Sequence, residues 1–216
     1  MKLYGHWRSL ATYRVRVAIA LKGIDVAFAP IDLLGKEHLG EHYRSINPQG
    51  LLPAFDDGSD RALFQSLAII EYLDERFPAP PLLPADARGR ARVRGLSQVI
   101  AADAHPLIVP RVRDYLLQDV GLDQAGLLKW INRFALPALE TIEADLARDP
   151  ATGRFCHGDA PTMADILLAS HVVGVSFFRC DLSPYPRVRK VFEACEALDA
   201  FASAHPLKQP GAPASI

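Results

Sequence analysis

The sequence is poor in cysteine, methionine and tryptophan, and it contains no long uncharged apolar run. Its three cysteines, Cys156, Cys180 and Cys195, are scattered and lack the spacing of metal ligands. This sparse, odd set of thiols argues against a disulfide framework and favours a reduced cytoplasmic protein with its thiols mostly in the core. No apolar segment approaches the roughly 20 residues needed to span a bilayer. The chain also opens without the basic and apolar segments of a signal peptide.

Net charge is nearly absent as well. The 24 basic side chains are balanced by 25 acidic ones, which gives a formal charge of -1. This balance argues against a general electrostatic attraction to nucleic acid or to an anionic membrane. What the chain has is length and apolar content: 216 residues, half of them hydrophobic, suffice for one large domain or two small ones with a real core.

The first 80 residues alternate between β-type and helical patterns. Strands are expected at 2–6, 26–32, 53–57 and 62–65. Helices are expected at 11–22, 38–46 and 67–77. This βαβ unit followed by ββα predicts a mixed sheet with helices on its faces.

The chain changes character in a proline-rich stretch at 78–89, which can continue neither a helix nor a strand. Beyond it the pattern is helical throughout. Helices are expected at 87–118, 123–148, 162–178 and 185–204. The predicted architecture is a small α/β domain at 1–82, a linker at 83–88 and an all-α domain at 89–216.

A hydroxyl residue stands at the start of the first expected helix. Ser9 and Thr12 are three residues apart, where a thioredoxin-like fold carries Cys-x-x-Cys. A helix N-terminus offers unpaired N–H groups and about half a unit of positive charge. Two interpretations follow. Either hydroxyl caps the helix, or Ser9 donates a hydrogen bond to a thiolate and lowers a thiol pKa from its ordinary value of about 8.5.

Two further segments have the character of a binding site. In NPQGLLPAF, a cis bond between Leu52 and Pro53 would turn the Leu52 backbone outward, where it can pair with a peptide-like ligand. Gln65 and Ser66 lie at a second expected helix N-terminus, which suits a carboxylate. The alternative for Ser66 is again a simple cap.

Taken together, these segments resemble a known family. Ser9 with the following YRVRVAIALKG, then NPQGLLP, QSLAIIEYL, GDAPTMAD and DLSPYP, is similar in order to the zeta class of glutathione transferases. The resemblance runs from Met1 to about Pro210. It implies a thioredoxin-like N-terminal domain, a helical C-terminal domain, a homodimer and glutathione bound along the N-terminal domain.

The resemblance also implies which positions contact glutathione. These are Ser9 with Leu10 and Ala11 at the sulfur, Leu52 and Pro53 at the cysteinyl backbone, Gln65 and Ser66 at the γ-glutamyl end, His38 at the glycine carboxylate, and His105 from the helical domain. Of these, Ser9 is the expected catalytic residue.

The sequence departs from the family at two places. Leu10 and Ala11 replace the usual Ser-Cys or Gly-Thr pair, and Phe177 replaces an arginine, the nearest one being Arg179. These changes leave the expected glutathione contacts in place. They bear on the identity of the second substrate.

Several arginines are candidates for binding that substrate. Arg8, Arg111 and Arg113 are expected to provide the positive charge that a carboxylate substrate requires, although the last two also suit a solvated helix face. Arg14 and Arg16 lie about 200° apart around a helix, so they cannot both face one site. We expect them to be scaffold residues paired with acids.

The function expected from the resemblance is a glutathione-dependent cis–trans isomerisation of a maleyl keto acid, maleylacetoacetate or maleylpyruvate, in aromatic catabolism. A glutathione transferase that conjugates or dehalogenates small electrophiles is the first alternative, favoured by the apolar Leu10, Ala11 and Phe177. A glutathione-binding protein without turnover is the second.

Overall fold

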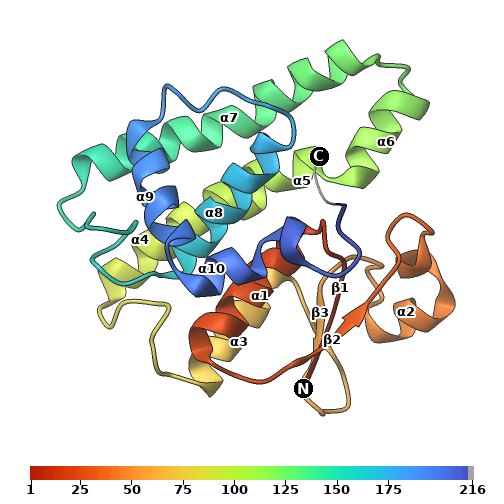
Figure 1. Cartoon of the computed structure of the whole chain (residues 1–216), viewed down its shortest axis with the longest axis horizontal. Coiled ribbons are helices and arrows are strands. Elements are labelled where there is room, and N and C mark those ends of the chain that lie inside the picture. Colours follow the sequence, from red (N-terminus) through yellow and green to blue (C-terminus); the bar gives the residue numbers. More distant parts are fainter. Residues whose placement is uncertain (214–216) are drawn as a thin grey trace. The chain divides into compact units, whose positions relative to one another are not determined.

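A computed structural model describes residues 1–213 as two compact units (Figure 1). The first unit combines Met1–Leu82 with the described residues from Leu198 onward, and the second is Leu83–Ala197. The last three positions of the predicted helical domain, 214–216, lie outside the described residues.

The first unit is built on a four-stranded mixed sheet. Its strands are β1 (Lys2–Gly5), β2 (Ala27–Pro30), β3 (Ala54–Asp56) and β4 (Leu63–Phe64), in the order β2-β1-β3-β4. β1 pairs in parallel with β2, and the β1–β3 and β3–β4 pairs are antiparallel. The predicted thioredoxin-like mixed sheet is therefore confirmed.

Helices cover both faces of this sheet. α1 (Leu10–Lys22) and α3 (Ser66–Arg76) pack together on one side. The short η1 (Glu37–Leu39) and α2 (Glu41–Ile46) stand on the other side, where Tyr43 is buried against Ile31 and Ala54. α1 ends at Gly23, whose φ of 62° closes the helix and returns the chain to β2.

The C-terminal segment returns to the first unit. α10 (Asp199–Ala204) and η3 (Pro206–Lys208) follow Leu198, and α10 packs on α1 (Figure 1). Phe201 is fully buried, and the ring of His205 meets Tyr13 edge-on at 6.1 Å between centroids. This segment was expected within the all-α domain at 89–216. Its contacts place it with α1, because a helical period shows that a face is apolar without showing what covers it.

The regular elements among the described residues of the second unit are all helices, and an isolated β-bridge joins Thr152 to Gly158. Its elements are α4 (Ala87–Gln98), the π-helix η2 (Val99–Ala104), α5 (His105–Ile108), α6 (Pro110–Gln118), α7 (Gln124–Arg148), α8 (Met163–Ser176) and α9 (Pro186–Glu196). Almost all of α8 is buried, and it packs on α4 and α9. Thr162 and Asp165 form a capping box at its start. The expected helices at 87–118, 123–148, 162–178 and 185–204 are present, the first and last of them interrupted.

One of the two interruptions has a local cause. Val109 is extended, with ψ 158°, because it precedes Pro110, which disfavours a helical conformation in the residue before it. The expected helix at 185–204 divides at Leu198, which is also extended.

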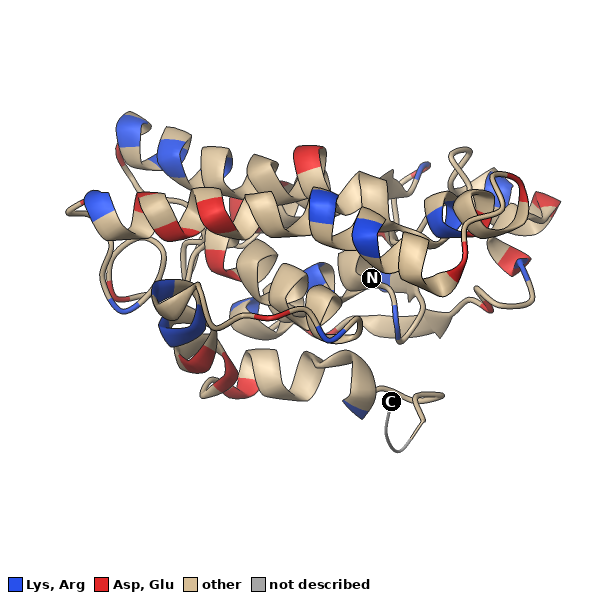
Figure 2. Ribbon diagram, turned by 90° about the horizontal axis from the view of Figure 1, so that it is seen from above, with Lys and Arg blue, Asp and Glu red and all other residues tan. Residues whose placement is uncertain are grey.

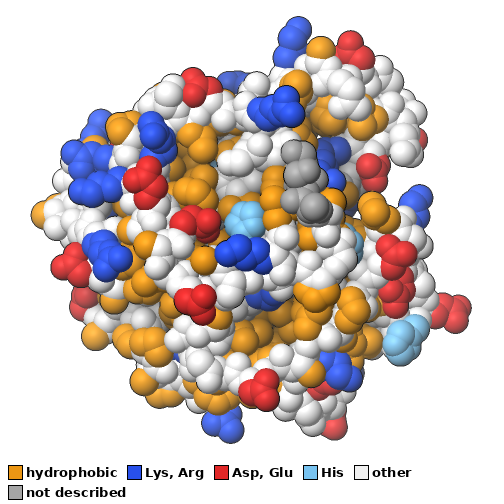
Figure 3. All heavy atoms as spheres, in the orientation of Figure 1, with side chains coloured by type: hydrophobic (Ala, Val, Ile, Leu, Met, Phe, Trp, Pro, Cys, Tyr) orange, Lys and Arg blue, Asp and Glu red, His pale blue; other side chains and the backbone are white. Residues whose placement is uncertain are grey.

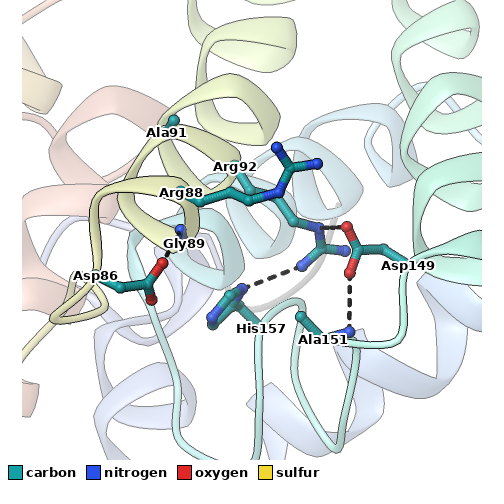
Figure 4. A pocket seen from close by; sticks show the side chains of 8 residues that line it. All are labelled: Asp86, Arg88, Gly89, Ala91, Arg92, Asp149, Ala151 and His157. Atoms are coloured by element: carbon teal, nitrogen blue, oxygen red, sulfur yellow. Dashed lines mark hydrogen bonds and ion pairs between the residues drawn. The ribbon is translucent and has the colours of Figure 1, made fainter.

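One part-buried cation, Arg92, connects three segments of the second unit. Arg92, on α4, pairs with Asp145 and Asp149 near the end of α7 and donates to the Thr152 hydroxyl and the Cys156 carbonyl. Figure 4 shows its ion pair with Asp149. These contacts border a cavity of about 540 Å³. It is lined by Asp86, Arg88, Gly89, Ala91, Arg92, Asp149, Ala151 and His157. Because the Arg92 charge is paired, we interpret this cluster as structural.

Charges of both signs are distributed along the helices (Figure 2), and on the face drawn in Figure 3 basic and acidic side chains are interspersed. Within residues 1–213 no helix has the length and apolar character required to cross a bilayer. The three cysteines are free thiols, and Cys156 and Cys195 are buried as expected.

Candidate active site

Two helix N-termini in the first unit carry unpaired backbone donors. The N–H groups of Leu10 and Ala11 at the start of α1 make no hydrogen bond to the described residues. The same is true of Ser66, Leu67 and Ala68 at the start of α3. Unpaired donors at a helix N-terminus are suited to binding anionic groups.

Ser9 is both a helix cap and an available donor. Its Oγ accepts the Thr12 N–H at 3.2 Å, which caps α1. Its own hydroxyl proton has no acceptor among residues 1–213. A serine hydroxyl can accept one bond while donating another. The two interpretations of Ser9 are therefore compatible.

The Leu52–Pro53 segment presents open backbone groups. The peptide bond is cis, as the sequence interpretation required. The Leu52 N–H and C=O make no hydrogen bond to any described residue. The preceding Leu51 carbonyl is held by the Tyr43 hydroxyl at 2.8 Å and by the Asn47 side-chain amide at 2.7 Å. The Leu52 backbone thus resembles an unpaired strand edge, and the hydrogen bonds to the neighbouring Leu51 carbonyl hold it in position.

Gln65 and Ser66 combine a rare backbone conformation with a buried cation. Gln65 has φ 72°, which is unusual for any residue with a side chain, and such conformations concentrate at functional sites. Its side-chain amide donates to Gln49 at 2.9 Å. The buried Arg14 donates to the Ser66 Oγ at 3.4 Å, and burial lowers the Arg14 pKa to about 9, so its charge is kept at neutral pH. Arg14 thus supports a predicted site residue, a role that the sequence did not show.

Two histidines lie close to these elements. Burial is the main cause that lowers the pKa of both His6 and His38, and neighbouring basic groups lower it further, while Asp32 partly opposes the shift at His6. The His38 Nδ1 is buried without a hydrogen-bond partner in the described chain. A neutral imidazole with an unused ring nitrogen is suited to binding a polar ligand group.

The other predicted residues differ in exposure. His105 is part-buried at the start of α5 and directly follows the π-helix, a feature that is frequent at functional sites. Arg8 and Arg111 are exposed. Arg113 is part-buried, with its guanidinium 5.2 Å from the centre of the Phe178 ring. Arg113 therefore lies next to the segment in which Phe177 replaces the arginine of the family.

Some of the predicted residues of the first unit are connected through neighbouring groups. Gly50 lies against the His38 carbonyl. Its neighbour Gln49 accepts a hydrogen bond from the side chain of Gln65, which directly precedes α3. At the other helix N-terminus, His38 is among the groups near enough to His6 to lower the pKa of its imidazole, and the His6 carbonyl accepts the Ser9 N–H. His105, Arg111 and Arg113 belong to the second unit.

Comparison with known proteins identifies the family. Residues 1–75 match the model of the glutathione S-transferase N-terminal domain. The chain is 44% identical to a maleylpyruvate isomerase of a Ralstonia species over 97% of this chain and 99% of that protein. It is 40% identical to the maleylacetoacetate isomerase of Pseudomonas aeruginosa, with both chains fully covered.

Solved structures agree with this assignment. One is a holo maleylpyruvate isomerase described as a bacterial zeta-class glutathione S-transferase, with a TM-score of 0.96, 43% identity and coverage of 99% of this chain and 100% of that one. Another is a maleylacetoacetate isomerase of Methylobacterium extorquens with bound malonate and glutathione, with a TM-score of 0.95, 46% identity and the same coverage. The chain is therefore an enzyme of the glutathione transferase family and belongs to its zeta class.

Proposed function

We propose that this enzyme is a glutathione-dependent isomerase that converts a maleyl keto acid, maleylacetoacetate or maleylpyruvate, into its fumaryl form. The similarity to isomerases over full length, at 40% and 44% identity, carries the proposal. A relative at 46% identity was solved with glutathione and the dicarboxylate malonate together, which fits a site for both a thiol and a dicarboxylate.

The residues of the first unit fit glutathione by their chemistry. A γ-glutamyl tripeptide has a peptide backbone, two carboxylates and one thiol. The open Leu52 backbone suits the cysteinyl amide, the donors at Gln65 and Ser66 suit the γ-glutamyl carboxylate, and His38 suits the glycine carboxylate. The start of α1 then takes the sulfur.

Bound glutathione supplies a thiolate that adds to the double bond, permits rotation about the resulting single bond and leaves again. Ser9 donates its O–H to the sulfur, and the Leu10 and Ala11 N–H groups add positive potential at the same helix end. The resemblance to the zeta class adds His105, which belongs to the second unit, to the residues expected to bind glutathione. Together these groups favour the thiolate over the thiol.

A maleyl keto acid also requires a cation, because a carboxylate bound against apolar side chains is costly unless it is paired. Of the three candidates, Arg8, Arg111 and Arg113, we assign this role to Arg113. It is the part-buried one, and its contact with Phe178 places it beside the position where the family has its arginine.

The competing activity is conjugation of small electrophiles, favoured by the apolar Leu10, Ala11 and Phe177. Parallel assays separate the two activities: isomerisation of maleylpyruvate and of maleylacetoacetate, and conjugation of a chlorinated aromatic. The proposal expects efficient turnover of at least one maleyl acid. Efficient conjugation with no maleyl turnover would support the transferase, and glutathione binding with neither activity would support a binding protein.

A homodimer and a cytoplasmic location are part of the same proposal. The three free thiols are consistent with a reducing compartment. Light scattering coupled to size-exclusion chromatography measures the mass directly, and a value near that of one 23.7 kDa chain would contradict the dimer.

A further inference from the structure

Arg16 is a buried arginine whose described partners are carbonyl groups. Its side chain lies in the interior of the first unit, with the residue 8% exposed. Nε donates to the Ala204 carbonyl at 3.1 Å, Nη1 to the His6 carbonyl at 3.5 Å and Nη2 to the Trp7 carbonyl at 3.3 Å. Its guanidinium carbon lies 6.0 Å from the centre of the Tyr13 ring. The acid that we expected beside Arg16 is absent among the described residues.

This arrangement is unusual in energetic terms. A buried charge is normally paired with an opposite charge, because removing it from water is costly. Burial lowers the pKa of Arg16 to about 10, so the group is still charged at neutral pH. Carbonyl oxygens satisfy its hydrogen bonds and leave its net charge uncompensated.

The two carbonyls from the N-terminal side belong to the turn that presents Ser9. We call residues 6–9 the Ser9 turn. The His6 carbonyl that accepts from Arg16 also accepts the Ser9 N–H at 3.1 Å. The Arg8 N–H donates to the His6 Nδ1 at 3.3 Å, which closes the turn. Arg16 is thus connected to the Ser9 backbone through a single carbonyl oxygen.

Charged and titratable groups from several elements lie around this turn. Arg8 and Arg16 are cations, and Asp32 is the acid that acts on His6. His6 and His38 have lowered pKa values and are neutral at pH 7. On the C-terminal side, His205 and Lys208 lie near Arg16. The pKa of His205 is lowered mainly by burial, and further by the charges of Lys208 and Arg16. Tyr13 faces Arg16 from the same helix.

We infer that Arg16 is a positioning residue of the active site: it holds the Ser9 turn in place, and its uncompensated charge stabilises a thiolate bound beside Ser9. The first part follows from the contacts of the protein alone, and the second rests on the proposed function. Arginine is required because its planar guanidinium spans three carbonyls, which the single ammonium of lysine cannot do.

Three variants separate geometry from charge. Arg16→Met removes the hydrogen bonds to the three carbonyls and the positive charge. Arg16→Lys keeps the charge and loses the planar guanidinium that spans the three carbonyls. Lys22→Met is the control, because Lys22 is also a buried cation of α1, yet it binds Asp74 and the Pro80 carbonyl at the opposite end of the helix. Two readouts are measured: amide hydrogen exchange of Ser9 in the glutathione-free protein, and the pKa of bound glutathione from its thiolate absorbance.

In Arg16→Met we expect Ser9 exchange to be about 10-fold faster and the thiol pKa to rise by about one unit, which means about 10-fold less thiolate below that pKa. Arg16→Lys should show the faster exchange with less than half of the pKa rise. If Arg16→Met does not fold, Ser9 exchange in Arg16→Lys still decides the positioning role, and a thiol pKa rise of a full unit in Arg16→Lys, with the charge retained, would overturn the role of the charge. Lys22→Met should lower the melting temperature and leave both readouts unchanged.

Wild-type Ser9 exchange in both Arg16 variants would overturn the positioning role. An unchanged thiol pKa in Arg16→Met, or a rise in Arg16→Lys equal to that in Arg16→Met, would overturn the role of the charge. Equal effects in Lys22→Met would reduce Arg16 to a general contributor to stability and overturn both. If the wild type does not bind glutathione, the proposed function and the charge role fail together, whereas the exchange measurement still decides the positioning role.

Discussion

Replacing Ser9 with alanine should affect the stability of the helix and the acidity of the bound thiol by separate amounts. The Ser9 Oγ accepts one backbone N–H, from Thr12 at 3.2 Å. Loss of such a cap costs about 1 kcal/mol, which lowers the melting temperature of a chain of this size by about 2–4 °C. The hydroxyl proton is unused in the described structure and is available to the sulfur. A hydrogen bond to a charged group contributes about 1.5–3 kcal/mol, so the thiol pKa should rise by about 1–2 units at about 1.4 kcal/mol per unit.

Asp123→Ala is the matched control for this experiment. The Asp123 side chain caps α7 by accepting the Gly126 N–H at 2.7 Å, in the same way that Ser9 caps α1. Both variants should lose a similar free energy of unfolding, measured by denaturant titration. Only Ser9→Ala should shift the ultraviolet titration of bound glutathione. If the thiol titrates in Ser9→Ala as it does in the wild type, Ser9 is only a helix cap and its catalytic assignment is refuted.

Three further outcomes are expected. Glutathione at 100 times its dissociation constant should stabilise the protein by about 2.7 kcal/mol, and a thermal melt unchanged by millimolar glutathione would contradict binding. Arg113→Met should lower kcat/KM for a maleyl acid by about 10²-fold, or about 2.7 kcal/mol, and should leave conjugation of a neutral electrophile nearly unchanged. Arg111 is exposed, so the control variant Arg111→Met should retain maleyl turnover. Full maleyl turnover by Arg113→Met would remove Arg113 from the substrate site. His6, His38 and His205 all have folded pKa values below 6.5, so the unfolded chain binds more protons than the folded one as the pH falls through 6.5. Their contribution to stability is therefore complete above pH 6.5 and is lost as the pH falls through the folded pKa values. The free energy of unfolding should decrease when it is measured at successively lower pH from 7.5 to 5.5. A free energy that does not change over this range would contradict the lowered histidine pKa values.

The sheet and its two main helices could be predicted because their signals are local. Alternating and helical periods determined β1, α1, β2 and α3 to within one or two residues at most ends. The break before Pro110 also had a visible local cause, although a continuous helix was expected there. The packing of α10 on α1 had no such local signal in the sequence. The apolar residues around Phe201 indicate that this segment is buried, but they do not indicate which element covers it.

The site divides in the same way. The local setting of Ser9, Leu52 and Ser66 could be predicted, because a hydroxyl at a helix start and a proline before a strand have a local physical meaning. Their roles toward glutathione stay predictions. The partners of Arg14 and Arg16 could not. An acid is the usual partner of a buried arginine, and the carbonyls that hold Arg16 come from the Ser9 turn and from Ala204, at the far end of the chain. Backbone acceptors leave no trace in residue types, so only the structure reveals them.

The balance of glutathione during turnover tests the central proposal most directly. An isomerase returns glutathione in every cycle, whereas a conjugating transferase consumes one molecule for each product. The enzyme is supplied with a maleyl keto acid in large excess over glutathione, and fumaryl product and free thiol are measured together. We predict that product exceeds the glutathione supplied many times over, that free thiol stays constant, and that no product forms without glutathione. Loss of one thiol per substrate molecule, or isomerisation that proceeds without glutathione, would contradict the proposed function.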